Sequence, residues 1–127
     1  MNERDEETIL VVDDEPAVVR ILTRIMKREG FQVVSASDGV EALEVLKSQR
    51  VVGMITDVMM PRMDGLTLLR EVRAAGYEFP AVVISGFIEP GWRPTLVACD
   101  VARALQKPFT PAQVRDAVRG VFDPEGR

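Results

Sequence analysis

The chain has 127 residues, enough for one domain with its own core and too few for two. Hydrophobic residues make up 46% and charged residues 28%, which is typical of a soluble globular protein and excludes a wholly disordered chain. The 16 basic and 20 acidic residues give a net charge of −4, which argues against nucleic-acid binding, and no apolar run reaches the ~18–20 residues of a membrane span.

The first half of the chain alternates short apolar runs with helical patterns. Residues 8–12 are continuously apolar, as in a strand buried on both faces of a parallel sheet. Pro16 opens a helix that Gly30 ends. The side chains expected to face the core from this helix are Val18, Ile21, Leu22, Ile25 and Met26. A second strand at 31–36 precedes a helix capped by Asp38. The inward residues expected there are Val40, Leu43 and Leu46.

The second half continues the alternation with one irregular stretch. A strand at 51–56, a helix capped by Asp64 and a strand at 81–85 follow one another. The stretch 86–100 holds three residues that interrupt helices, namely Pro90, Gly91 and Pro94. Only about residues 94–99 are expected to be helical, because the proline at position 94 also biases Arg93 away from helical angles.

The last elements complete an α/β pattern. Residues 101–105 form a strand whose Arg103 indicates a sheet edge, and Thr110 begins a capping box for a final helix. Five βα units with right-handed crossovers predict a parallel sheet with helices on both faces. We expect this domain to span residues 8–122, between a flexible acidic tail at 1–7 and a C-terminal tail at 123–127.

The residue types that are missing restrict the chemistry. The sequence has no histidine and a single cysteine, Cys99. Ser-His-Asp and Cys-His catalysis, His-based zinc sites and thiolate clusters are therefore excluded. A lone cysteine, together with an acidic start that lacks the features of a signal peptide, predicts a cytoplasmic location.

Polar residues stand where four of the five strands end, which is where parallel sheets bind ligands. Asp13 and Asp14 follow the first strand, Asp57 the third, Ser85 ends the fourth and Lys107 follows the fifth. Each residue alone could be an ordinary cap or turn residue. In a sheet ordered 2-1-3-4-5, however, the three aspartates converge, and their repulsion requires protonation or a cation.

The oxygen ligands predict a hard cation at this edge, Mg²⁺ before Ca²⁺. A divalent ion, a lysine and a hydroxyl around one carboxylate make a site for a phosphoryl group. An aspartate can act as a nucleophile and carry an acyl phosphate.

Three segments carry a resemblance to a known family. They are 11–16 (VVDDEP), 56–65 (TDVMMPRMDG) and 107–109 (KPF). Together they resemble the CheY-like receiver domain of two-component response regulators, over about residues 8–122. The resemblance implies a flavodoxin-like (βα)5 sandwich with a five-stranded parallel sheet of order 2-1-3-4-5, to which the prolines add a short or irregular fourth helix.

The resemblance also implies roles for individual residues. Asp57 is expected to accept a phosphoryl group from a phosphohistidine of a partner. Asp14, Asp57 and the backbone carbonyl of Met59 are expected to bind Mg²⁺ directly, and Asp13 through water. Lys107 and Ser85 are expected to contact the phosphoryl oxygens, with a cis bond between Lys107 and Pro108.

The same resemblance implies partners and a kind of activity. The donor is expected to be a histidine kinase or a histidine phosphotransfer protein, and the output an unknown downstream protein, with no nucleic acid or membrane bound by this domain. The domain is expected to be a switch, not an enzyme beyond self-phosphorylation and self-dephosphorylation, and a monomer or a weak phosphorylation-dependent dimer. The basic residues Arg20, Arg24, Lys27 and Arg28 form either a solvated helix face or a docking surface for a kinase.

One position departs from the family pattern. Receivers carry Tyr or Phe three residues before the lysine, where this chain has Ala104, so activation is expected to be relayed differently.

Two alternatives to a phosphorylation-controlled switch remain. A Mg²⁺-dependent phosphohydrolase with an Asp nucleophile calls for a second acid at the position of Met59, and a phosphorylation-independent interaction module is favoured by loss of the acidic pair or of Lys107.

Overall fold

A computed structural model describes residues 7–123, so the tails expected at 1–7 and 123–127 lie almost wholly outside the described residues. The elements alternate strand and helix from end to end. They are β1 (Thr8–Val12), α1 (Pro16–Arg28), β2 (Gln32–Ala36), α2 (Gly39–Ser48), β3 (Gly53–Asp57), α3 (Gly65–Ala74), β4 (Ala81–Ser85), the 3₁₀ turn η2 (Pro90–Trp92), α4 (Arg93–Ala98), β5 (Val101–Gln106) and α5 (Pro111–Phe122). Within residues 7–123, no helix is both long and apolar enough to span a bilayer.

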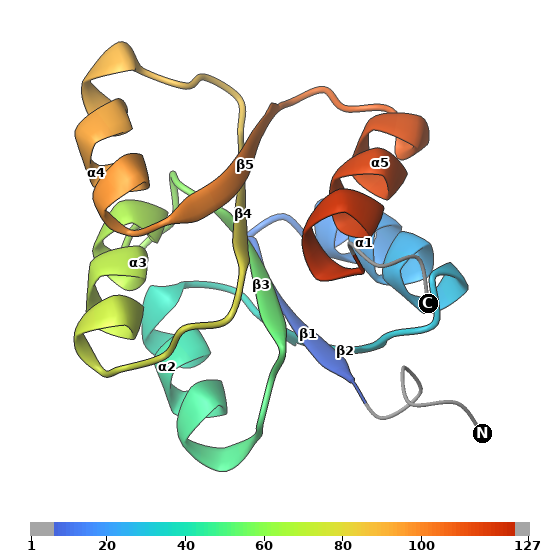
Figure 1. The fold of residues 1–127 in the computed structure, drawn as a ribbon, viewed down its shortest axis with the longest axis horizontal. Helices are drawn as coiled ribbons and strands as arrows, with labels where there is room; N and C mark the ends of the chain where they lie inside the picture. Colours follow the sequence, from blue (N-terminus) through green and yellow to red (C-terminus); the bar gives the residue numbers. More distant parts are fainter. Residues whose placement is uncertain (1–6, 124–127) are drawn as a thin grey trace.

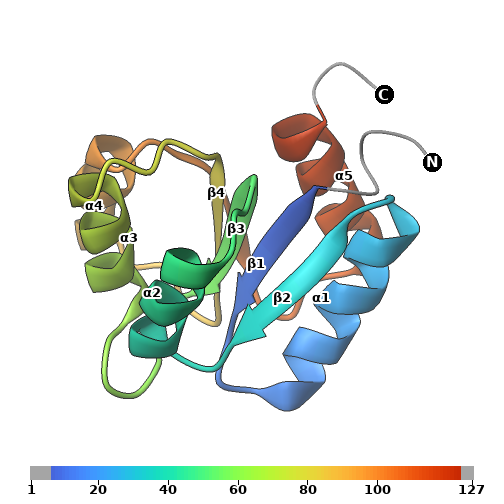
Figure 2. The same ribbon diagram turned by 90° about the horizontal axis from the view of Figure 1, so that it is seen from below.

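The five strands form one parallel sheet of order β2-β1-β3-β4-β5, as expected. Helices α1 and α5 cover one face, and α2, α3 and α4 cover the other (Figure 1). The three layers are separated when the domain is viewed from below (Figure 2). Because β1 and β3 are neighbours, their carboxyl ends lie side by side, and β4 places its end next to β3.

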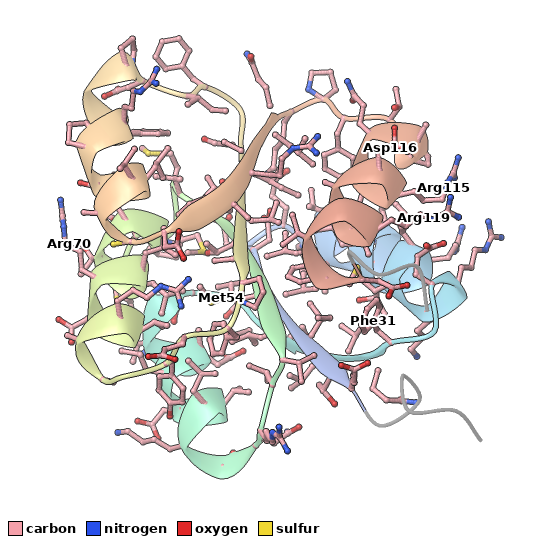
Figure 3. The ribbon with its side chains drawn as sticks, in the orientation of Figure 1. Phe31, Met54, Arg70, Arg115, Asp116 and Arg119 are labelled. Carbon is pink, nitrogen blue, oxygen red and sulfur yellow. The ribbon has the colours of Figure 1, made fainter. Side chains whose placement is uncertain are left out.

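Each face of the sheet has its own hydrophobic core. In β1, Ile9 and Val11 pack under α1 and α5, whereas Leu10 and Val12 pack under α2 and α3. All four side chains are buried, which explains why this strand is a continuous apolar run rather than an alternating one. Met54, labelled in Figure 3, lies in the core between the sheet and helices α2 and α3. The two cores fix β1 and β3 from both sides, and so fix the residues at their ends.

Helix starts follow the predicted caps, but two predicted helix faces need correction. The side chains of Asp38, Asp64 and Thr110 each accept a backbone N–H of their own helix. Ile21, expected in the core, is 46% exposed, because it lies at the rim of the apolar arc of α1, beyond the fully buried side chains of that helix. In α2, Leu46 is buried and Leu43 packs against the core as expected, whereas Val40 is only partly buried. The unpredicted Ala42 is fully buried, and its small side chain allows the helix to approach the sheet closely.

Helix α4 has six residues, in agreement with the short fourth helix expected. The prediction for Arg93 was wrong, since it adopts helical angles (φ −53°, ψ −44°) and begins the helix. Pro94 falls in the first turn, where backbone N–H groups have no partner within the helix, so a proline there removes no hydrogen bond. Two arginines of α3 hold the helix: Arg70 Nη2 donates to Thr95 Oγ1 (2.9 Å), and Arg73 Nε donates to the Cys99 carbonyl (2.8 Å).

Strand β5 lies at the edge of the sheet, as Arg103 indicated. Val101 pairs with Ala81 and Arg103 with Val82, so the intervening Ala102 is an unpaired bulge residue. Ala104, at the position of the missing aromatic, is exposed.

Candidate phosphoacceptor site

Asp57 ends β3 and is buried at the carboxyl edge of the sheet. Its Oδ1 accepts the backbone N–H of Val58 (2.7 Å), and its Oδ2 lies 3.1 Å from the Nζ of Lys107. The Thr56 hydroxyl donates to the backbone carbonyl of Asp57 (2.8 Å), which holds the end of the strand. The Asp57 carboxylate is thus oriented by a hydrogen bond and an ion pair.

Three further carboxylates face Asp57 from the end of β1. Asp13 is buried, and its Oδ1 accepts the backbone N–H of Glu15 (2.9 Å). Asp14 and Glu15 are exposed. One oxygen from each of Asp13, Asp14, Glu15 and Asp57 lies within 4.8 Å of the others. This cluster of oxygen ligands suits a hard divalent cation, and the convergence expected of the three aspartates is present.

Lys107 follows β5 and reaches across the site. Its Nζ lies 3.0 Å from Asp13 Oδ2, 3.0 Å from Glu15 Oε1 and 3.1 Å from Asp57 Oδ2. The bond between Lys107 and Pro108 is cis, as predicted. The Lys107 backbone N–H donates to the Ser85 carbonyl (2.7 Å), which joins the end of β4 to this loop.

The charges of the site shift one another's pKa values. Burial raises the pKa of Asp13 above its ordinary value, against the opposing effects of the Glu15 N–H and of Lys107. Burial alone lowers the pKa of Lys107, but the carboxylates of Glu15, Asp13 and Asp57 together raise it above its ordinary range. The lysine is therefore a permanent cation at neutral pH.

Ser85 and Met59 lie beside the cluster without touching it. Ser85 ends β4, and its buried hydroxyl donates to the Phe87 carbonyl (3.0 Å) in the loop that follows. The Met59 side chain is 69% exposed two residues after Asp57, and Phe87 is 63% exposed two residues after Ser85. Two large apolar side chains are thus exposed just beyond the ends of β3 and β4.

The loop between β3 and α3 is fixed by contacts that the sequence analysis did not identify. Arg62, with φ 66°, makes two hydrogen bonds to the buried Asp38 carboxylate, at 2.7 and 3.1 Å. The Arg62 side chain holds the pKa of Asp38 below its ordinary value. A Cβ on Gly65 would collide with the Asp57 carbonyl oxygen, so only glycine permits this close approach. The only sequence signal for these contacts was the capping role of Asp38.

Comparison with known proteins decides the family. The model of the response regulator receiver domain matches residues 9–119. The chain belongs to this family. The receiver domain is 37% identical over 114 residues to the response regulator MprA of Mycobacterium ulcerans, covering 90% of this chain and 49% of that protein. It therefore spans about half the length of the curated relatives it matches.

Solved structures agree with the receiver fold. Chemotaxis protein CheY4 of Vibrio cholerae matches with a TM-score of 0.83 and 28% identity, over 91% of this chain and 98% of that one. A CheY-like receiver domain protein from Methanospirillum hungatei matches with a TM-score of 0.86 at 20% identity, over 93% and 94% of the two chains, and supports the fold alone. The solved structures therefore agree with the family model in giving this chain the fold of a receiver domain.

Proposed function

We propose that this receiver domain accepts a phosphoryl group on Asp57 from a phosphohistidine of a histidine kinase or phosphotransfer protein, in a Mg²⁺-dependent reaction, and relays the change to an output partner. The observation that carries the proposal is the setting of Asp57. Its carboxylate is buried at the end of the central strand, is in contact with Lys107 and lies beside the acidic pair Asp13 and Asp14.

The bond changes of the transfer can be assigned to the groups at this edge of the sheet. A carboxylate oxygen of Asp57 attacks the phosphorus in line with the leaving group. The new O–P bond forms as the P–N bond of a phosphohistidine, or the P–O bond of an acyl phosphate, breaks. The leaving group departs with the bonding electron pair, and the imidazole then takes a proton from solvent. Lys107 is close enough to stabilise the charge on the phosphoryl oxygens.

The residues present fit a magnesium ion. Asp14, Asp57 and the Met59 carbonyl would hold it directly, and Asp13 through water, in a set made only of oxygen ligands. Bound there, the ion neutralises charge on the transferring group. The cluster has four carboxylates, and among the described residues one cation, Lys107, is in contact with them. The excess negative charge would be balanced by a divalent ion.

Ser85 is proposed to contact a phosphoryl oxygen, which requires its hydroxyl to leave the Phe87 carbonyl. Movement of this bond would transmit phosphorylation to the loop before α4. With Ala104 exposed and no aromatic ring to rotate, we propose that the loop itself becomes ordered.

The docking site for the donor is proposed on α1 and the start of α5. Ile21, Ile25, Phe109 and Pro111 line a groove of about 330 Å³ bordered by arginines. Those arginines are Arg24, Arg28 and Arg115, and none forms an ion pair within residues 7–123. Figure 3 shows Arg115 on the outer side of α5. A helix with an apolar stripe and acidic flanks, such as those that carry a kinase's histidine, fits this groove.

The proposal is tested by incubating the protein with a small acyl phosphate, with and without Mg²⁺, and measuring the intact mass. We expect one phosphoryl group per chain only when Mg²⁺ is present. Rapid multiple turnover of the acyl phosphate would instead favour the phosphohydrolase, and no labelling under any condition would favour a phosphorylation-independent interaction module.

Asp14→Ala is expected to abolish Mg²⁺ binding and to raise the melting temperature of the metal-free protein slightly. The Asp14 side chain is exposed, so its removal relieves repulsion from Asp13 and Asp57 without losing packing. Thermal unfolding with EDTA and with Mg²⁺ measures both effects. Glu71→Ala, an exposed acid on α3, is the control. A metal-free Asp14→Ala protein that is clearly less stable than the parent would contradict the repulsion argument.

The phosphorylated form is expected to be long-lived, and Met59→Asn should shorten its lifetime severalfold. Hydrolysis requires a water in line with the phosphorus, and neither Met59 nor Phe87 can orient one, whereas an amide can. The decay of the phosphorylated mass after removal of the donor gives the lifetime. Met59→Leu, which stays apolar, should behave like the parent. Equal lifetimes in Met59→Asn and Met59→Leu would exclude this role.

Phosphorylation is expected to increase protection from hydrogen exchange at residues 86–98. Arg70 and Arg73 already hold α4 to α3, so the largest change should fall at 86–92. Exchange is compared with and without fluoroberyllate, which mimics a phosphoryl group on aspartate. A segment that is fully protected in the free protein, or unchanged after binding, would rule out ordering as the switch.

A further inference from the structure

Three carboxylates surround the Lys107 ammonium in the resting protein. Asp13, Glu15 and Asp57 each place one oxygen 3.0 to 3.1 Å from its Nζ, and Nζ donates hydrogen bonds to Glu15 and Asp57. A phosphoryl oxygen on Asp57 can therefore bind Lys107 well only by replacing one of these three oxygens. The reaction proposed above includes an exchange of partners at this lysine.

The three partners differ in how easily they can be released. The side chains of Asp13 and Asp57 are almost completely buried, so either would lose its counter-ion without gaining full hydration. The side chain of Glu15 is 60% exposed, so water can replace Lys107 around its carboxylate. Glu15 is the partner whose release has the smallest cost.

Apart from its place in the acidic cluster, the Glu15 side chain pairs with Lys107 alone among the residues that the structure describes. Glu15 occupies the N-cap position of α1, yet its side chain forms no cap hydrogen bond. Within residues 7–123, Lys107 is the partner that the structure shows for its carboxylate. After release the carboxylate stays beside the amino end of α1, where the helix dipole favours a negative charge.

From these contacts we infer that Glu15 is a resting-state partner of Lys107 that the phosphoryl group displaces, and that it weakens the binding of phosphoryl groups by competing for the lysine. This inference rests on the proposed function of Asp57. It makes Glu15 a positioning residue, which acts through Lys107 and touches neither the phosphoryl group nor the ion.

The test is the affinity of Glu15→Gln for fluoroberyllate in the presence of Mg²⁺. We expect affinity roughly two- to five-fold tighter than in the parent, because an exposed ion pair is lost only from the resting state. Glu44→Gln is the matched control, since Glu44 is also exposed and paired with a lysine, Lys47, at 3.4 Å. That variant should bind as the parent does.

A second readout follows Lys107 directly. The chain has three lysines, at 27, 47 and 107, so their Nζ signals can be assigned by NMR with single Lys→Arg variants. In the free protein, Glu15→Gln should shift the Lys107 signal, and with fluoroberyllate bound the parent and variant signals should coincide. Unchanged or weaker fluoroberyllate affinity in Glu15→Gln, with an unmoved Lys107 signal, would overturn the inference alone. A parent protein that binds no fluoroberyllate would overturn the proposed function.

Discussion

Asp57→Asn is expected to remove all phosphoryl labelling by small acyl phosphates or by a phosphorylated histidine donor. The asparagine oxygen can still accept the Val58 N–H, and Lys107 keeps its contacts with Asp13 and Glu15 when the amide nitrogen replaces the oxygen that faced it, so the fold is retained while the nucleophilic carboxylate is lost. Intact mass and acid-labile label, measured side by side, give the stoichiometry.

The matched control is Asp116→Asn, which changes the same residue type at an exposed position on the outer side of α5 (Figure 3). It should be labelled like the parent. Labelling of Asp57→Asn at the parent's stoichiometry would show that another residue accepts the phosphoryl group, and would remove the basis of the proposed mechanism.

Lys107→Met is expected to destabilise the metal-free protein by about 3 kcal/mol at pH 8. Loss of the ammonium leaves the buried carboxylates of Asp13 and Asp57 without a counter-ion, and breaking one side of a buried ion pair has a cost of this order. The value lies at the low end of that range because the Lys107 side chain is still 16% exposed. Urea unfolding in EDTA measures the loss, and Mg²⁺ should restore part of it.

The loss should shrink when the pH falls to 5. The pKa of Asp13 is raised in the folded protein, so from about pH 4 up to that pKa the folded state binds more protons than the unfolded chain, and stability falls as pH rises. Without Lys107 this window extends to higher pH, so acid should stabilise the variant more than the parent. Lys47→Met, at an exposed lysine, is the control. A pH-independent loss would show that packing, not charge, explains the effect.

Most of the fold follows from local sequence signals. The strand at residues 8–12, the caps at Asp38, Asp64 and Thr110, and the parallel topology depend on residues close together in the chain, and all were predicted. The errors in the helix faces and at Arg93 arose where tertiary contacts decide the structure. Ile21 lies at the rim of an apolar arc, and Arg93 enters a helix because a 3₁₀ turn precedes it.

The sequence predicted which residues make up the site, but not which of their side chains pair with one another. The ends of the strands indicated which residues meet, since parallel strands end at one edge. Nothing in the sequence indicated that Glu15 would bind Lys107, 92 positions away, instead of capping its own helix. The pairing of Arg62 with Asp38 could not be predicted either, because it joins two loops that approach each other only when the sheet is packed. The metal and phosphoryl roles of these residues stay predictions.

The bulge in β5 has a consequence for self-association. A free strand edge offers a row of N–H and C=O groups with which another strand can pair, and this is a common route to aggregation. In β5 the unpaired Ala102 disturbs that row at the second residue of a six-residue strand, and the exposed charge of Arg103 follows it immediately. An approaching strand would find only residues 103–106 in regular register, with the charge of Arg103 at one end. We therefore expect the bulge and this charge to weaken strand pairing at this edge, so that the domain stays dispersed at concentrations where an uninterrupted edge would polymerise.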